Sequence, residues 1–134
     1  MLTFIKKHKL FLYISLLSLV GGFLRFYKLD WAQGLFTHPD EYHIAASVSQ
    51  LSFPNQMHPH FFSYGTLAIY LIYFTQELVN FLSITFNSFL IGRFYSALFS
   101  TLTIFIAYKI CRSFMQTRFS YLAALLVAIT PGLI

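Results

Sequence analysis

The segment from His38 to His43 reads His-Pro-Asp-Glu-Tyr-His and contains Asp40 and Glu41, two of the four acidic residues in the chain. A carboxylate at a membrane surface is suited to act as a general base that takes a proton from a hydroxyl acceptor. The same two carboxylates would also suit the first turn of a helix, where they complement the helix dipole and the free N–H groups. Spacing alone leaves both interpretations open.

Four of the five histidines lie in the same part of the chain, and with the acidic pair they could supply nitrogen and oxygen ligands to a metal ion. Their spacing matches no established zinc motif. We therefore expect hydrogen bonding at a membrane interface from these side chains, and a requirement for a divalent metal stays open. The four residues are His38, His43, His58 and His60.

Arg93 is one of two charged residues between Phe61 and Tyr108, and Glu77 is the other. An ionisable side chain at membrane depth is costly and is therefore a functional candidate. A guanidinium can hold an anionic phosphate group. The alternative is an interfacial anchor at the start of a span. Glu77 is the partner that the sequence suggests for Arg93.

Further residues beside the apolar runs are expected at the membrane interface. Arg25 and Lys28 would anchor a span, because long basic side chains reach toward the interface. Tyrosine and tryptophan are enriched there, and a sugar-stacking role is the less favoured alternative for them. The aromatic residues concerned are Tyr27, Trp31, Tyr64, Tyr70 and Tyr73.

The composition indicates that these residues belong to a membrane protein. Hydrophobic residues make up 57% of the 134 positions and charged residues only 10%, whereas soluble chains carry about a quarter charged residues. This nearly excludes a soluble globular enzyme. The net charge of +5 comes from basic residues at the ends of apolar runs, which suits membrane orientation better than nucleic-acid binding. The single Cys111 excludes an intramolecular disulfide.

The pattern of apolar runs predicts an all-α polytopic membrane protein. Residues 28–90, which contain three of the four prolines, would be an outer loop. Within it, Pro39 would begin a short helix after Thr37 or His38, with an apolar stripe on the membrane surface formed by Ile44, Ala45, Val48 and Leu51. The predicted order is a cytoplasmic start at 1–9, span 1 at 10–27, the outer loop with interfacial helices at 28–90, span 2 at 91–109, a cytoplasmic turn at 110–118 and a truncated span 3 at 119–134.

Basic clusters decide this topology, because they mark the cytoplasmic side. One cluster is formed by Lys6, Lys7 and Lys9, and the other by Lys109, Arg112 and Arg118. If both are cytoplasmic, an even number of spans separates them. Segment 61–83 would then lie along the outer interface. Two alternatives remain: a third crossing by 61–83, and cleavage of the first apolar run as a signal peptide.

The order of these pieces resembles the start of the membrane-embedded glycosyltransferases of the GT-C fold. The nearest groups are the protein O-mannosyltransferases, the lipid A aminoarabinose transferases and the lipopolysaccharide galacturonosyltransferases. His38 to His43 resembles their acidic motif in the first outer loop. His58-Pro59 resembles the start of their His-Pro-Pro-Leu element, although His60 replaces the second proline. Arg93 to Leu98 resembles their Arg-Phe-x-Ser-Ala segment.

This resemblance implies a function for the candidate residues. The donor would be a sugar on a polyprenyl phosphate, and the acceptor a hydroxyl of a lipid, glycan or protein at the outer face of the plasma membrane. Asp40 would be the base of an inverting displacement, and Glu41 would orient it or contact substrate. Arg93 would support the loop or the donor phosphate, and His58 and His43 would contact substrate. The chain would be an N-terminal fragment, inactive alone. The competing class is a non-enzymatic transporter or scaffold.

Overall fold

The structure is a computed structural model that describes residues 2–31, 33, 35, 38–63, 65–84 and 86–130, with side chains from Phe11 onward. The described residues form five α-helices and no strand, which confirms the all-α prediction. The helices are α1 (Leu2–Phe26), α2 (Pro39–Ser49), α3 (Thr66–Phe81), α4 (Ser88–Phe114) and α5 (Thr117–Ile129). They divide into two compact units, one of residues 1–27 and 96–134 and one of residues 28–95.

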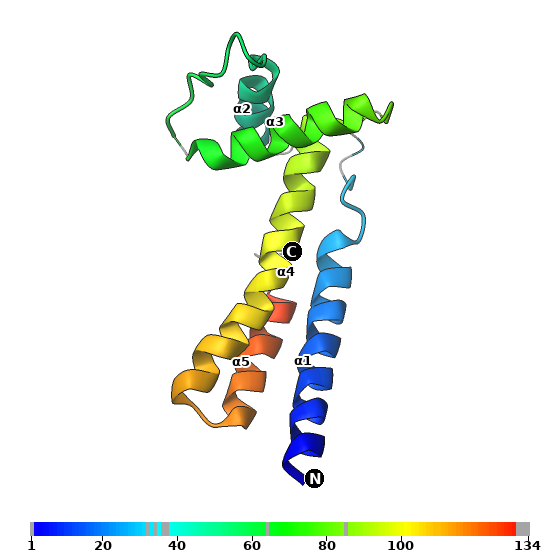
Figure 1. The fold of residues 1–134 in the computed structure, drawn as a ribbon, viewed down its shortest axis with the longest axis vertical. Helices are drawn as coiled ribbons and strands as arrows, with labels where there is room; N and C mark the ends of the chain where they lie inside the picture. Colours follow the sequence, from blue (N-terminus) through cyan, green and yellow to red (C-terminus); the bar gives the residue numbers. More distant parts are fainter. Residues whose placement is uncertain are drawn as a thin grey trace. The chain divides into compact units, whose positions relative to one another are not determined.

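The first unit is a bundle of α1, α5 and the greater part of α4, and α1 packs directly on α5 (Figure 1). Ser120, Ala124 and Ala128 recur every four residues on α5 and are buried. Gly21 on α1 lies so close that an added Cβ would overlap Ile104 and would come within 3.2 Å of the Ala128 Cβ. Small residues at such an interface let two helix backbones approach closely.

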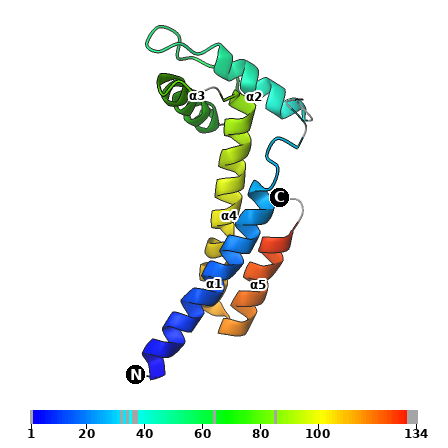
Figure 2. The ribbon, with the colours of Figure 1, turned by 90° about the vertical axis from the view of Figure 1, so that its right-hand side faces the viewer.

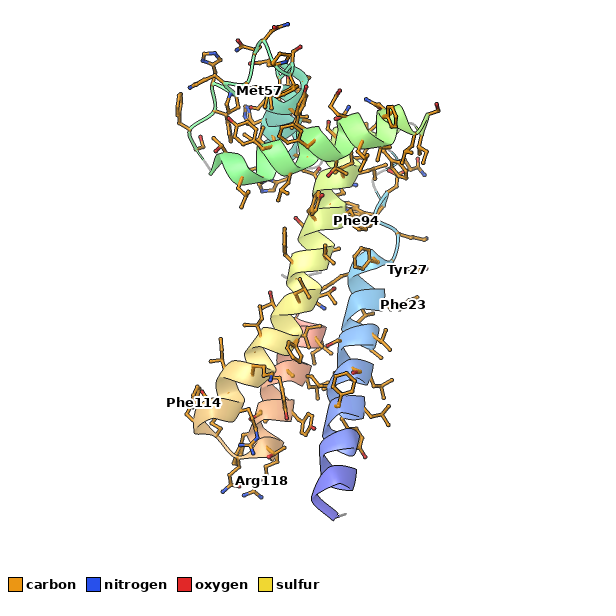
Figure 3. The ribbon with its side chains drawn as sticks, in the orientation of Figure 1. Phe23, Tyr27, Met57, Phe94, Phe114 and Arg118 are labelled. Atoms are coloured by element: carbon orange, nitrogen blue, oxygen red, sulfur yellow. The ribbon has the colours of Figure 1, made fainter. Side chains whose placement is uncertain are left out.

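The outer surface of this unit carries large hydrophobic side chains, around a core formed by Ile14, Ile104, Ala124 and Ala128. Buried positions include Arg25 and Ser120, whereas large hydrophobic side chains stand exposed along each of its helices, as the sticks around Phe23 and Phe114 illustrate (Figure 3). A water-soluble bundle would instead carry charged and polar residues on this surface. The exposed residues include Phe11, Leu16, Leu19 and Phe23 on α1, Phe99, Leu102 and Ile106 on α4, and Leu122, Leu125 and Leu126 on α5.

Helix lengths partly match the predicted spans. Among the described residues, α4 is the one helix long and apolar enough to cross a membrane, and it contains all of predicted span 2. The helix in the span 1 region begins at Leu2 and includes the predicted cytoplasmic start, because no helix breaker precedes the apolar run. In the span 3 region α5 begins at Thr117 and ends at Ile129, since Thr130 is already extended. Residues 131–134 lie outside the described part.

The second unit is built from α2, α3 and the first turns of α4. In Figure 1 α3 runs across those turns, and in Figure 2 it is seen nearly end-on beside them. Its core contains Val48 and Leu51 from the α2 stripe, with Ile69, Ile72 and Tyr73 from α3 and Ile91 from α4. The stripe predicted to face the membrane is therefore buried against protein, because α3 offers it an apolar partner. This corrects the prediction for the stripe of α2.

Tyrosines of α3 hold the loop that follows α2. The Tyr70 hydroxyl donates to the Met57 carbonyl at 2.9 Å, and the Tyr73 hydroxyl accepts from the Phe53 amide at 2.8 Å. The two residues predicted as interface aromatics thus have internal partners. Tyr64 lies outside the described residues.

Candidate functional site

The acidic pair lies in the first turn of α2, as the sequence predicts. His38 is the N-cap residue in an extended conformation, and Pro39 is the first helical residue. Proline suits this position because its fixed φ matches a helix and it has no N–H to leave unpaired. The His38 Nδ1 accepts from the Asp40 amide at 3.2 Å. Local sequence therefore places Asp40 and Glu41 side by side at the positive end of a helix.

Arg93 on α4 binds Glu41 with two hydrogen bonds. Its Nε lies 2.7 Å from Glu41 Oε1, and its Nη2 lies 2.9 Å from Glu41 Oε2. The side chains are 9% and 24% exposed, respectively. This bidentate geometry is the strongest form of a guanidinium–carboxylate contact. Glu41 takes the place predicted for Glu77, which is exposed on α3.

The same guanidinium holds the segment that precedes α2. Its Nη1 donates to the Leu29 carbonyl at 2.9 Å, and its Nη2 donates to the Leu35 carbonyl at 3.4 Å. With the two bonds to Glu41, four of its five N–H groups are donated to protein acceptors. The rings of Trp31 and Phe89 lie 5.4 Å and 5.2 Å from its central carbon. Arg93 thus joins α4, α2 and the Leu29–Leu35 segment in one cluster, named here the Arg93 clasp.

The Asp40 carboxylate has a different neighbour from that of Glu41. The Asp40 side chain is 43% exposed, and its Oδ2 lies 3.2 Å from His38 Nδ1. That ring nitrogen can cap the Asp40 amide with its lone pair or, when it carries a proton, donate to the carboxylate, but it cannot do both at once. Two adjacent carboxylates therefore have different environments. The Glu41 carboxylate is bound by the Arg93 guanidinium, whereas the Asp40 carboxylate is partly exposed to solvent.

The remaining predicted site residues lie in exposed positions. The His43 ring stacks on Phe61, with ring centroids 6.4 Å apart. His58 contacts its own loop, where its Nδ1 accepts from the His60 amide at 3.1 Å. Within the described ranges, no three His, Cys, Asp or Glu side chains gather closely enough to hold a metal ion.

His60 has a backbone conformation that a proline at this position could not adopt. Its φ is 49°, and a proline ring fixes φ near −65°. The amide that donates to His58 would also be absent in a proline. The loop conformation found here is therefore incompatible with a proline at position 60.

A second polar cluster, which the sequence did not reveal, surrounds Arg25 in the first unit. Arg25 is 4% exposed. It donates to the carbonyls of Gly21 at 2.8 Å, Ala128 at 2.9 Å and Val127 at 2.7 Å, and to the Ser100 hydroxyl. Two of these acceptors are the unpaired carbonyls at the end of α5, where a cation is favourable. Arg25 therefore joins three helices rather than anchoring a span at the interface.

The sequence contains one signal that could have indicated this role. All four acidic residues lie at positions 30–77, inside the second unit, so the first unit has no carboxylate to pair with Arg25. A cation without an acidic partner in an apolar bundle must find carbonyl or hydroxyl acceptors.

The chain matches no protein-family model, no curated protein and no solved structure.

Proposed function

We propose that the chain is a multi-pass membrane protein whose first unit lies in the lipid bilayer. The observation that supports this is the distribution of exposed residues: large hydrophobic side chains cover the outside of α1, α4 and α5, and the polar Arg25 is inside. Lipid removes the cost of exposing such a surface, and it makes internal pairing of every polar group necessary. Arg25 with its four acceptors fulfils that requirement.

The proposed topology places residues 28–90 on the outer face of the plasma membrane, with both basic clusters in the cytoplasm. The fold of α3 supports it. This helix buries Ile69, Ile72 and Tyr73 in the core of the second unit. It also packs with α2 in the second unit. Segment 61–83 is therefore assigned to the outer side rather than to a crossing.

The activity that we propose is transfer of a sugar from a polyprenyl-phosphate donor to a hydroxyl of a lipid, glycan or protein. The Asp40 carboxylate takes the proton from the acceptor hydroxyl while that oxygen attacks the anomeric carbon. The bond from the anomeric carbon to the phosphate oxygen breaks, and polyprenyl phosphate leaves with the electron pair. Attack from the opposite side inverts the anomeric configuration.

The contrast within the acidic pair supports this assignment of roles. Asp40 is exposed and free of Arg93, so its carboxylate can reach an acceptor, whereas Glu41 is held by two hydrogen bonds. We assign Glu41 and Arg93 as positioning residues that fix the first turn of α2. This differs from a donor-phosphate role for Arg93, because phosphate would have to displace its present acceptors. His43 and His58 remain proposed substrate contacts.

Asp40→Asn tests the proposal in membranes that contain the complete gene product. The substitution keeps the shape and a side-chain oxygen but removes the basicity, so transfer from polyprenyl-phosphate sugars should fall by about 10²–10⁴-fold. Glu77→Gln, on the exposed face of α3, is the matched control and should retain activity. Wild-type turnover by Asp40→Asn would remove Asp40 as the base. No transfer from any lipid-linked sugar by the wild type would favour the transporter or scaffold class.

A further inference from the structure

Trp31 is the one tryptophan of the chain, and it lies exposed on the surface rather than buried. The residue is 64% exposed, although it lies in the Leu29–Leu35 segment that Arg93 binds at both ends. Its ring also lies 5.4 Å from the Arg93 central carbon, within cation–π range. An exposed indole is thereby held in place by a residue that is itself nine-tenths buried.

The neighbours of Trp31 narrow the class of ligand. Through Arg93 the indole is tied to the carboxylate of Glu41. Asp30 directly precedes the indole in sequence. Carboxylates accept hydrogen bonds from hydroxyl groups, and a flat aromatic ring offers a face for polarised C–H groups. A sugar ring has both kinds of surface.

Two other ligands fit this surrounding less well. A free phosphate group has no C–H face to stack on an indole, and the nearby guanidinium of Arg93 already has Glu41 and two carbonyls as acceptors. Insertion of the indole among lipid headgroups, the usual place of an interfacial tryptophan, would draw acidic side chains toward the negatively charged surface of a membrane. Neither ligand uses both the aromatic face of Trp31 and the hydrogen-bond acceptors beside it.

We propose that Trp31 is a stacking platform for the sugar ring of the substrate, held in position by the Arg93 clasp. This inference rests on the proposed function and adds a binding residue to it. The ring could belong to the lipid-linked donor or to a glycan acceptor, since both present the same C–H face. Trp31 touches substrate in this proposal, whereas Glu41 and Arg93 act through it and through Asp40.

Fluorescence of the single tryptophan tests binding without any activity. The chain is placed in lipid nanodiscs, and acrylamide quenching is measured with polyprenyl-phosphate hexoses and pentoses and with bare polyprenyl phosphate. We expect a sugar-bearing lipid to lower the quenching constant and bare polyprenyl phosphate to leave it unchanged. Three results would overturn the proposed stacking role of Trp31. Bare polyprenyl phosphate could lower the quenching constant as much as a sugar-bearing lipid, or no sugar-bearing lipid could lower it. Strong quenching of Trp31 by brominated lipids would instead place the indole among lipid headgroups.

Kinetics of the complete gene product separate this inference from the proposed function. Trp31→Leu should raise KM for donor or for glycan acceptor about 3- to 10-fold, the range expected from loss of aromatic stacking, with kcat changed less. Trp31→Phe should recover part of the loss at equal abundance. Phe81→Leu, which alters an aromatic residue that is 84% exposed in the same unit, is the control. Unchanged KM values in an active Trp31→Leu enzyme would overturn the platform alone, whereas an inactive wild type would overturn the proposed function.

Discussion

The hydrogen bonds between Glu41 and Arg93 should make a measurable contribution to the stability of the second unit. Glu41→Gln keeps one acceptor oxygen but turns an NH₂ group toward a guanidinium nitrogen. One charge-assisted bond is lost, so the free energy of unfolding should fall by about 2 kcal/mol. Arg93→Met removes the pair and both carbonyl contacts. Its cost should be about 3–5 kcal/mol, the usual range for a broken buried pair.

The double variant gives the energy of the contact itself. Once Arg93 is absent, Glu41→Gln has no partner to lose, so the double variant should resemble Arg93→Met. The coupling energy should therefore be about 2 kcal/mol, within the range found for residues in direct contact. Water can reach Glu41, which is 24% exposed, and this keeps the value below that of a fully buried pair.

Denaturation in mild detergent, followed by Trp31 fluorescence, measures these free energies. The indole lies over the Arg93 guanidinium, so its emission reports the same cluster that the substitutions disturb. Glu77→Gln is the matched control, since the sequence suggests Glu77 as the partner of Arg93. Additive effects, with a coupling energy below about 0.5 kcal/mol, would refute the Arg93–Glu41 contact. Coupling between Arg93 and Glu77 would refute the assigned partner.

Three further outcomes are expected. Cys111, near Lys109 and Arg112, should resist an impermeant thiol reagent in intact cells and react after permeabilisation, whereas labelling in intact cells would reverse the proposed topology. Arg25→Met should lower the free energy of unfolding by about 3 kcal/mol, because the buried α5 carbonyls lose their donor. Arg25→Lys should restore only part of the lost stability, and unchanged stability in Arg25→Met would contradict the role of Arg25 in joining the three helices. Gly21→Ala should cost about 1–3 kcal/mol by overpacking against buried Ile104, and Gly22→Ala should cost less, because its nearest neighbour is a Thr101 methyl group at 3.2 Å. Equal melting temperatures for these two variants would contradict the packing of α1.

The sequence by itself determined the features that depend on a few neighbouring residues. Pro39 and the acidic residues after it specify the start of α2, because capping and the helix dipole act within one turn. The uncharged run before Lys109 similarly specifies the long helix α4, because hydropathy and length are properties of the segment itself. The all-α class follows from these same local signals.

Only the tertiary structure decided which distant residues meet. Glu41 and Arg93 are 52 positions apart, and Arg25 reaches carbonyls more than 100 positions away. The sequence pattern shows that these charges need partners, but the packing of whole helices selects the partner. The α2 stripe gives the same lesson: its periodicity shows an apolar face, while the presence of α3 determines that the face meets protein rather than lipid. Periodicity records how apolar a surface is, and the fold determines what covers it.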